Sequence, residues 1–248
     1  MDEHLTGGDL VRRASRTQFT ALVGNVVMVV PLALAIDAVV WLVRGHHVLD
    51  AAAATSLVRA HQPFTSGTFV WAATTAVWLW AASLLAGGVE NWFIVRELPG
   101  AIASNRVLRR FIGPTRAQTL SRRLEGAISG LGGNVGFGLL LGFMPVLVGL
   151  FGIPLEVRHV TFVAGQLVFA VLSLGPLSLA GGDVLAAVAV VPVVGLINFA
   201  VSFLLALVVA LRARGLGNRW LLRLGRAVAA ELVRRPGAFF LAPPDQKV

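Results

Sequence analysis

The chain has 248 residues, of which 56% are hydrophobic and 13% are charged, and its formal net charge is +9. This composition, with a mean hydropathy of +0.80, is typical of a membrane protein and excludes an ordinary soluble domain. Cysteine is absent, which excludes a disulfide framework, a thiolate nucleophile and a cysteine-type zinc site. Nearly all of the 21 basic residues are arginines grouped beside apolar runs, a pattern that favours membrane flanks over a nucleic-acid surface.

The apolar runs predict an all-α fold, a polytopic helical membrane bundle that forms a single domain over residues 1–248. One crossing of the hydrocarbon layer needs roughly 20 apolar helical residues. No cleavable signal peptide is expected, because the N-terminal stretch MDEHLTGGD is acidic and the first apolar run is longer than a signal-peptide core. About five spans are predicted, over residues 19–43, 69–95, 126–153, 160–179 and 184–211, with basic amphipathic surface helices within residues 96–125 and 218–235.

The first span contains Asp37 within its apolar sequence, and the loop after it contains three of the five histidines. We expect Arg44, about two turns after Asp37, to neutralise that carboxylate near the outer end of the span. His46 and His47 are neighbours whose side chains point to different faces, and no carboxylate follows His61 at helical ligand spacing. No metal site and no cofactor is therefore predicted.

The third predicted span begins with GLGGNVGFGLLLGFMP, in which small residues recur at helical spacing. Such spacing lets the backbones of neighbouring membrane helices approach closely. Pro145 removes a backbone donor inside this span, and Pro154 is expected to end it. The span is therefore either a tightly packed helix or a broken, re-entrant one. Close helix packing is expected at Gly132, Gly133, Gly136, Gly138 and Gly142.

A dense polar cluster follows Pro154 and supplies the candidate catalytic residues Glu156, Arg158 and His159. A membrane-surface enzyme would use His159 as acid or base, with Glu156 or Arg158 orienting the ring. The competing interpretation is a salt-bridged helix cap without catalysis.

The distribution of basic residues poses a conflict of topology. The N-terminal flank has three lysines and arginines, the loop over residues 96–125 has seven, and the tail from residue 212 has eight. Five crossings place that loop and the tail on opposite faces, whereas the positive-inside rule places both in the cytoplasm. We expect five crossings, with a re-entrant third segment as the alternative.

Several polar residues lie inside the predicted spans, where an unpaired amide or carboxylate is costly. We expect them to converge in an intramembrane polar layer through which the protein acts as a transporter, a scaffold or an envelope factor. Asn134 is expected to be the most sensitive member of the layer. The layer is predicted to contain Asn25, Glu90, Asn91, Asn134, Gln166 and Asn198.

Three phrases resemble a known bacterial family: GGVENWFIVRELPGAIASNRVLRR, LGGNVGFGLLLGFMPVLVGLFGIPLEVRHVTF and INFAVSFLLALVVALRARG. They are similar to the C-terminal membrane region of the Gcr-type site-specific recombinase family (SpecificRecomb). The likeness covers about residues 18–243. Members are much longer, so the resemblance implies that this chain corresponds to their C-terminal part. It supplies no catalytic residues to carry over.

Recombinase chemistry is not expected in this chain alone. A tyrosine recombinase needs a tyrosine nucleophile, and the sequence contains none. A serine recombinase needs arginines in a water-accessible DNA cleft, whereas the arginines here flank spans. A membrane-anchored part of a DNA recombination protein is the alternative. The expected location is the bacterial inner membrane, and the expected partners are the lipid bilayer, anionic lipid at the basic flanks, and a protein partner or a preceding region.

Overall fold

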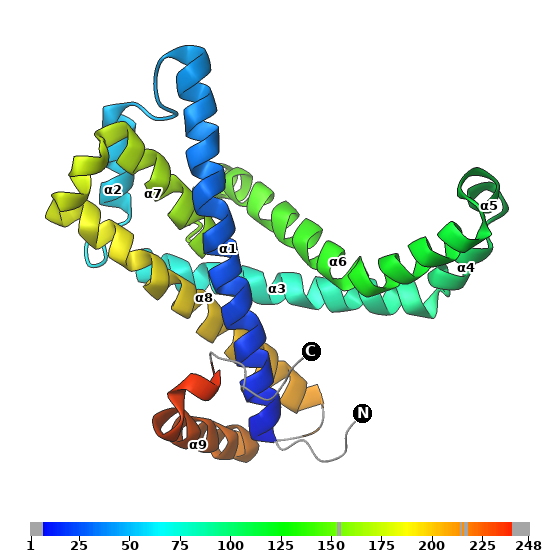
Figure 1. Cartoon of the computed structure of the whole chain (residues 1–248). Helices are drawn as coiled ribbons and strands as arrows, with labels where there is room; N and C mark the ends of the chain where they lie inside the picture. The colour runs from blue at the N-terminus through cyan, green and yellow to red at the C-terminus, as the bar shows by residue number, and fades with distance from the viewer. Residues whose placement is uncertain (1–6, 153–154, 214, 216–217, 240–248) are drawn as a thin grey trace. The chain divides into compact units, whose positions relative to one another are not determined.

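The computed structural model describes residues 7–152, 155–213, 215 and 218–239. Every regular element in these residues is helical, so the predicted all-α fold is confirmed (Figure 1). The α-helices are α1 (Gly7–Arg44), α2 (Ala51–Ala60), α3 (Thr68–Val95), α4 (Leu98–Ser104), α5 (Arg106–Ile112), α6 (Pro114–Phe151), α7 (Val160–Leu174), α8 (Gly182–Ala213) and α9 (Asn218–Arg234). Two short 3-10 helices, η1 (Pro176–Ala180) and η2 (Pro236–Phe239), follow α7 and α9.

Four of these helices, rather than five, are long and apolar enough to cross a membrane: α1 from Ser15 onward, α3, α6 and α8. The fourth predicted span differs, because α7 has only 15 residues. At a rise of 1.5 Å per residue it is about 22 Å long, less than the roughly 30 Å of the hydrocarbon layer. Gly175, with φ of +84°, ends α7, and Pro176 then begins η1.

The third predicted span is a continuous helix and not a broken one. The helix α6 runs for 38 residues, through Pro145, and ends at Gly152 in a left-handed conformation with φ of +62°. Pro154, expected to end the span, lies outside the described residues.

The helices form two units, which are described separately. The first contains residues Met1–Ala76 and Arg158–Val248, and the second contains Val77–Val157. In the second unit, α3 and α6 approach closely at glycines. A Cβ atom on Gly132 would lie 3.0 Å from Cβ of Val89, and one on Gly133 would lie 3.2 Å from Cβ of Ala86.

Gly136 makes the same kind of contact, since a Cβ there would lie 3.2 Å from Cδ1 of Leu85. Gly138 and Gly142 differ, because a Cβ at either would meet nothing within 4 Å. Three of the five expected packing glycines therefore face α3. Gly136 follows Gly132 by four residues and Gly133 by three, which keeps the three glycines on one side of α6.

The surface helices predicted within residues 96–125 are three separate segments: α4, α5 and the first turns of α6. Asn105 caps α5, since its Oδ1 accepts from the backbone N–H of Leu108 at 2.9 Å. The hydroxyl of Ser121 donates to the carbonyl of Pro99 at 2.6 Å, which holds α4 against α6. The surface helix predicted within residues 218–235 is α9.

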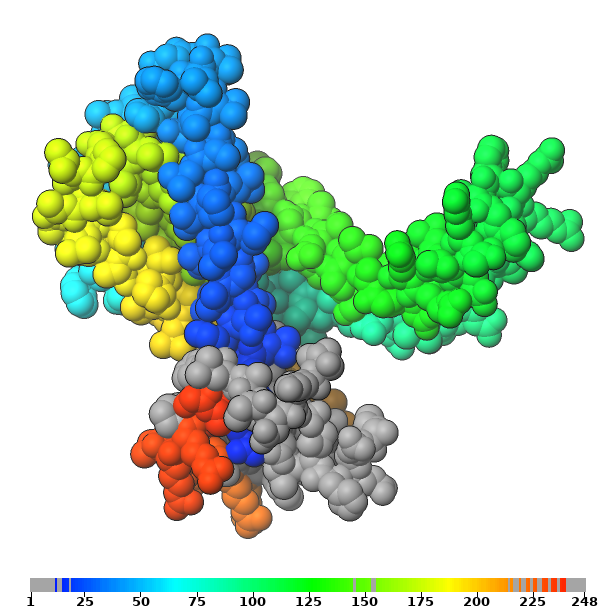
Figure 2. Space-filling view, in the orientation of Figure 1, coloured from blue at the N-terminus to red at the C-terminus, as the bar shows by residue number. Residues whose placement is uncertain are grey.

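In the first unit, α7 packs among α1, α2 and α8. Its Val163, Leu167 and Ala170 are buried together with Val58 of α2 and Val194 of α8. The outer side of α1 is instead exposed along most of its length, as Figure 2 shows. An apolar side chain left exposed on a candidate span is expected where the helix faces lipid.

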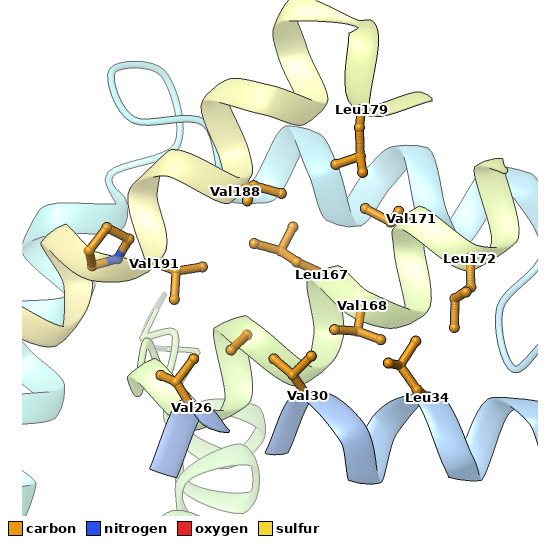
Figure 3. A pocket seen from close by; sticks show the side chains of 12 residues that line it. Val26, Val30, Leu34, Leu167, Val168, Val171, Leu172, Leu179, Val188 and Val191 are labelled. Atoms are coloured by element: carbon orange, nitrogen blue, oxygen red, sulfur yellow. The ribbon is translucent and has the colours of Figure 1, made fainter. Parts of the chain in front are cut away.

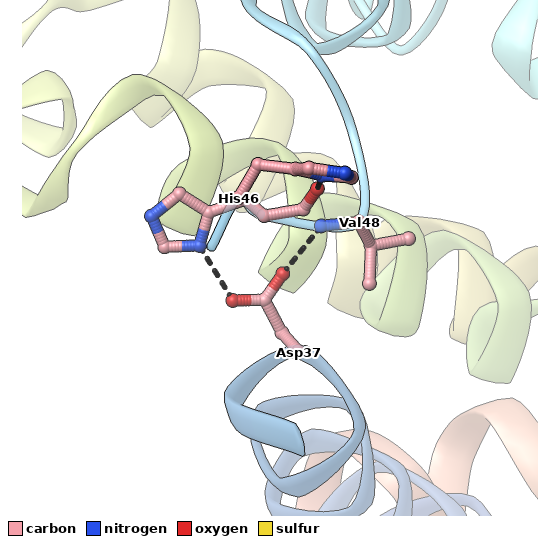
Figure 4. A network of polar contacts seen from close by, with 4 residues as sticks. Asp37, His46 and Val48 are labelled. Atoms are coloured by element: carbon pink, nitrogen blue, oxygen red, sulfur yellow. Dashed lines mark hydrogen bonds and ion pairs between the residues drawn. The ribbon is translucent and has the colours of Figure 1, made fainter. Parts of the chain in front are cut away.

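Asp37 of α1 does not use the expected partner Arg44, which is exposed. Its Oδ2 lies 2.7 Å from Nδ1 of His47, and its Oδ1 accepts from the backbone N–H of Val48 at 2.9 Å (Figure 4). The chain reverses at Gly45, with φ of +73°, and this turn carries the loop back over Asp37. A carboxylate that is 2% exposed is thus satisfied by the loop that follows it.

Candidate functional site

The described residues contain a buried polar cluster where α7 begins beside the middle of α8. At its centre is the Asn198 side chain, which is 3% exposed. Its Oδ1 accepts from the backbone N–H of Val160, the first residue of α7, at 3.1 Å. Its Nδ2 donates to the carbonyls of Ala72 at 2.8 Å and of Arg158 at 3.1 Å. One side chain therefore joins α3, α7 and the segment before α7.

Arg158 is the buried charge of this cluster, and it is 7% exposed. Its backbone N–H donates to the hydroxyl of Thr75 at 2.8 Å, and that hydroxyl donates to the carbonyl of Trp71 at 2.8 Å. Its Nη2 donates to the carbonyl of Ala60 at the C-terminal end of α2, at 2.8 Å. The guanidinium thus satisfies a carbonyl that the end of α2 leaves without a helical partner.

The backbone over residues 155–159 is not helical, although it leads to a helix that begins deep in the apolar core. Irregular backbone at such a depth needs protein partners for its N–H and C=O groups. Thr75 and Asn198 supply them for Arg158 and Val160. Close approach at this point depends on Gly195, where a Cβ would lie 2.7 Å from Cδ1 of Leu22 and 3.2 Å from Cγ2 of Val160.

His61 lies at the end of α2 near Arg158 and is 1% exposed. Its Nδ1 lies 2.8 Å from the carbonyl of Leu57, so Nδ1 carries the proton and donates it. Burial lowers the pKa of His61 to about 4; the hydrogen bond to Leu57 opposes this shift and the charge of Arg158 adds to it. The ring is therefore neutral near pH 7.

The three candidate catalytic residues are in different environments. Arg158 is buried, His159 is half-buried and Glu156 is exposed. His159 is the N-cap residue of α7 without a side-chain capping bond, and its ring meets Phe162 edge-on at 6.1 Å between centroids. Burial lowers the pKa of His159 to about 4, which keeps this ring neutral too.

Of the six residues of the predicted polar layer, only Asn198 is buried. In the first unit, Asn25 and Gln166 are exposed, and the hydrogen bonds of Asn198 go to backbone groups and to neither of them. In the second unit, Asn134 and Asn91 are exposed and Glu90 is half-buried.

Sequence reasoning missed the role of Thr75 as the partner of the Arg158 backbone. A threonine inside a span carries no strong signal, because its hydroxyl commonly bonds the carbonyl four residues earlier in its own helix. Thr75 does so and also accepts from Arg158, a contact across 83 positions of sequence. Only the tertiary arrangement brings these residues together.

A family model described as site-specific recombinase matches residues 5–243. The chain belongs to the site-specific recombinase family. The resemblance carried by the three sequence phrases is thereby confirmed, and the match covers nearly the whole chain of this family member. No curated protein and no solved structure matches it.

Proposed function

We propose that this protein is a multi-pass scaffold of the bacterial inner membrane that holds three basic segments against the cytoplasmic surface. The carrying observation is the ion pair between Nη1 of Arg12 and Oε1 of Glu231, which are 2.8 Å apart. Arg12 precedes the apolar part of α1, and Glu231 lies in α9, after α8. The N-terminal flank and the C-terminal tail therefore meet at one end of the first unit.

The contact between the N-terminal flank and the C-terminal tail supports an even number of membrane crossings. A chain whose two ends lie on the same side of the membrane must cross it an even number of times. The four long apolar helices give such a number, with α7 entering and leaving on the same side. The flank, the loop over residues 96–125 and the tail then share one side, with three, seven and eight basic residues respectively. The positive-inside rule assigns that side to the cytoplasm and removes the conflict of the five-crossing prediction.

The helix α9 has the features of an interfacial membrane helix. Leu222 and Val233 are 64% and 84% exposed, and the exposed Arg219, Arg223 and Arg226 lie on the same helix. Exposed apolar side chains beside arginines favour a helix that lies in the headgroup region and attracts anionic lipid. The tail would thus be held on the cytoplasmic surface of the membrane.

The polar cluster supports a scaffold more than a transporter or an enzyme. The hydrogen bonds of Asn198 go to backbone groups, so the side chain stabilises the start of α7 and presents no free amide to a solute. The neutral ring of His159 packs against Phe162. Intramembrane polar residues with this pattern shape the backbone where a helix is interrupted.

A second candidate function is the membrane-anchored part of a DNA recombination protein. Membership of the site-specific recombinase family favours it. The basic segments would then contact DNA phosphates in place of lipid headgroups, and this contact would weaken steeply with salt.

Single-cysteine variants test the topology without background labelling, because the chain has no cysteine. The exposed positions Ser56, Ser104 and Ala229 report on the first loop, the basic loop and the tail. We expect an impermeant maleimide to label Ser56→Cys in intact spheroplasts. Ser104→Cys and Ala229→Cys should react only after permeabilisation. Labelling of Ala229→Cys in intact spheroplasts would contradict the proposal.

The same Ala229→Cys protein, carrying an environment-sensitive dye in nanodiscs, separates the two candidate functions. A scaffold held on lipid should show a more apolar dye environment when anionic lipid is present, and high salt should reduce the change. A DNA-binding tail should respond instead to duplex DNA in nanodiscs of zwitterionic lipid. The DNA response without the lipid response would favour the second function.

A further inference from the structure

An apolar groove of about 420 Å³ lies in the first unit, among α1, α7 and α8. Figure 3 shows Val30 and Leu34 of α1 facing Val168 and Leu172 of α7, with Val188 of α8 across the opening. All of its lining residues carry hydrocarbon side chains. It runs along the candidate spans α1 and α8, so its open side lies at the depth of lipid chains.

The groove is closed at one end by the contact between α1 and α8. Leu22 fills the space over Gly195, where an added Cβ would be 2.7 Å away from its Cδ1. One turn further along α1 the lining begins at Val26, and it continues to Leu34. These two residues are about 12 Å apart along the helix axis. The helices thus separate toward the end at which α1 finishes, and α7 fills only part of the space between them.

We propose that this groove binds one acyl chain of a phospholipid. The lining offers no hydrogen-bonding side chain, so a polar solute or an unfolded peptide would lose its hydrogen bonds there, whereas an acyl chain has none to lose. The neighbouring surface of α8 is apolar as well, since Leu185, one turn before the lining residue Val188, is 57% exposed. A lipid chain can therefore enter from the side without crossing a polar barrier.

The closed end sets the orientation of the lipid. The chain end would lie toward Val26 and Ala164, and the headgroup would lie beyond Leu34, near the turn that follows α1. This end of α1 is opposite to Arg12, so the lipid belongs to the leaflet away from the basic segments. The leaflet assignment alone rests on the proposed topology; binding in the groove does not.

Photocrosslinking of the whole protein in nanodiscs tests the proposal. The probe is a phosphatidylcholine with a diazirine near the middle of one acyl chain. We expect crosslinks concentrated on the segments that contain Val30, Val168 and Leu172. The variant Val168→Phe fills the groove and should at least halve the crosslinks, whereas Val27→Phe, on the exposed side of α1, should leave them unchanged.

Crosslinks spread over α1 and α8 in proportion to exposure, and equal in both variants, would identify bulk lipid and overturn the proposal. A protein dimer crosslinked through the groove would identify a second copy as the occupant and overturn it as well. Thermal unfolding of both variants shows whether either is misfolded. If one is, the distribution of crosslinks on the unmodified chain still shows whether the lipid chain occupies the groove. Because nanodiscs expose both leaflets, groove binding is measured independently of the topology.

Discussion

The side-chain oxygen Oδ1 of Asn198, in the middle of α8, accepts a hydrogen bond at 3.1 Å from the backbone N–H of Val160, where α7 begins. This bond lets a helix start inside the apolar core. The first N–H groups of a helix have no helical partner, and hydrocarbon supplies none. Asn198 therefore stabilises the start of α7 and the non-helical segment before it within the apolar core.

Replacement of Asn198 by leucine should destabilise the first unit more than replacement of any other predicted polar-layer residue. It removes three hydrogen bonds and leaves the N–H of Val160 and the carbonyls of Ala72 and Arg158 buried without their partner. We expect a loss of about 2 kcal/mol or more in the free energy of unfolding in mixed micelles. The exposed Asn25 is the control, and Asn25→Leu should change this free energy by less than about 0.5 kcal/mol. Equal stability of Asn198→Leu and the unmodified protein would contradict the assignment.

Two glycines on α6 form a matched pair for the packing of the second unit. Gly136→Leu should weaken the contact between α3 and α6, because even a Cβ there would lie 3.2 Å from Cδ1 of Leu85. Gly138→Leu should be tolerated, since a Cβ there meets nothing within 4 Å. Overpacking typically costs about 1 to 3 kcal/mol, which thermal unfolding in detergent can resolve. Similar loss of stability in both variants would mean that α6 is not oriented as described.

The ion pair between Arg12 and Glu231 predicts a specific crosslink. In the double variant Arg12→Cys and Glu231→Cys, a short bifunctional maleimide should join the two positions within one chain, because the native Nη1 and Oε1 are 2.8 Å apart. Ser56→Cys paired with Glu231→Cys is the control, since residue 56 follows the opposite end of α1. The ion pair itself is partly exposed and should contribute little to stability. Failure of the first pair to crosslink would remove the basis for an even number of crossings.

The stability of the first unit should fall as the pH falls from about 6.5 toward 4. Burial lowers the pKa of His61 to about 4, so the unfolded chain takes up a proton before the folded one does. The stabilisation is complete above the unfolded pKa and is lost as the pH falls through this window. Thermal unfolding over pH 4 to 7 should show a weaker dependence in His61→Gln than in the unmodified protein. Equal pH dependence in His61→Gln and the unmodified protein would contradict the prediction.

Among the predicted polar-layer residues, we expect replacement of Asn198, and not of Asn134, to lower the free energy of unfolding most. The sequence alone does not reveal this difference. Both amides lie in apolar helical segments, and composition makes each costly to bury. Which of them is buried depends on how the helices are rotated about their axes. Asn198 points into the core of the first unit, whereas Asn134 is exposed on α6.

The sequence by itself determined the all-α fold, the candidate spans near α1, α3, α6 and α8, the basic surface helices and the family. These features depend on composition and local periodicity, because hydrocarbon permits little besides helices of sufficient length. The glycine spacing on α6 belongs to the same class, since small residues on one helix face indicate close packing before the partner is known.

Only the tertiary structure decided where the apolar sequence is interrupted. Residues 160–179 are as apolar as a span, and the glycines and Pro145 made the third segment the more plausible place for a break. The structure has a continuous α6 and a short α7, which ends at Gly175 before Pro176. Thr75 and Asn198 satisfy the non-helical backbone before α7 and the first N–H of α7. Those contacts join residues 83 and 38 positions apart. Hydrogen bonds over such separations follow from the packing of whole helices, and no local pattern encodes them.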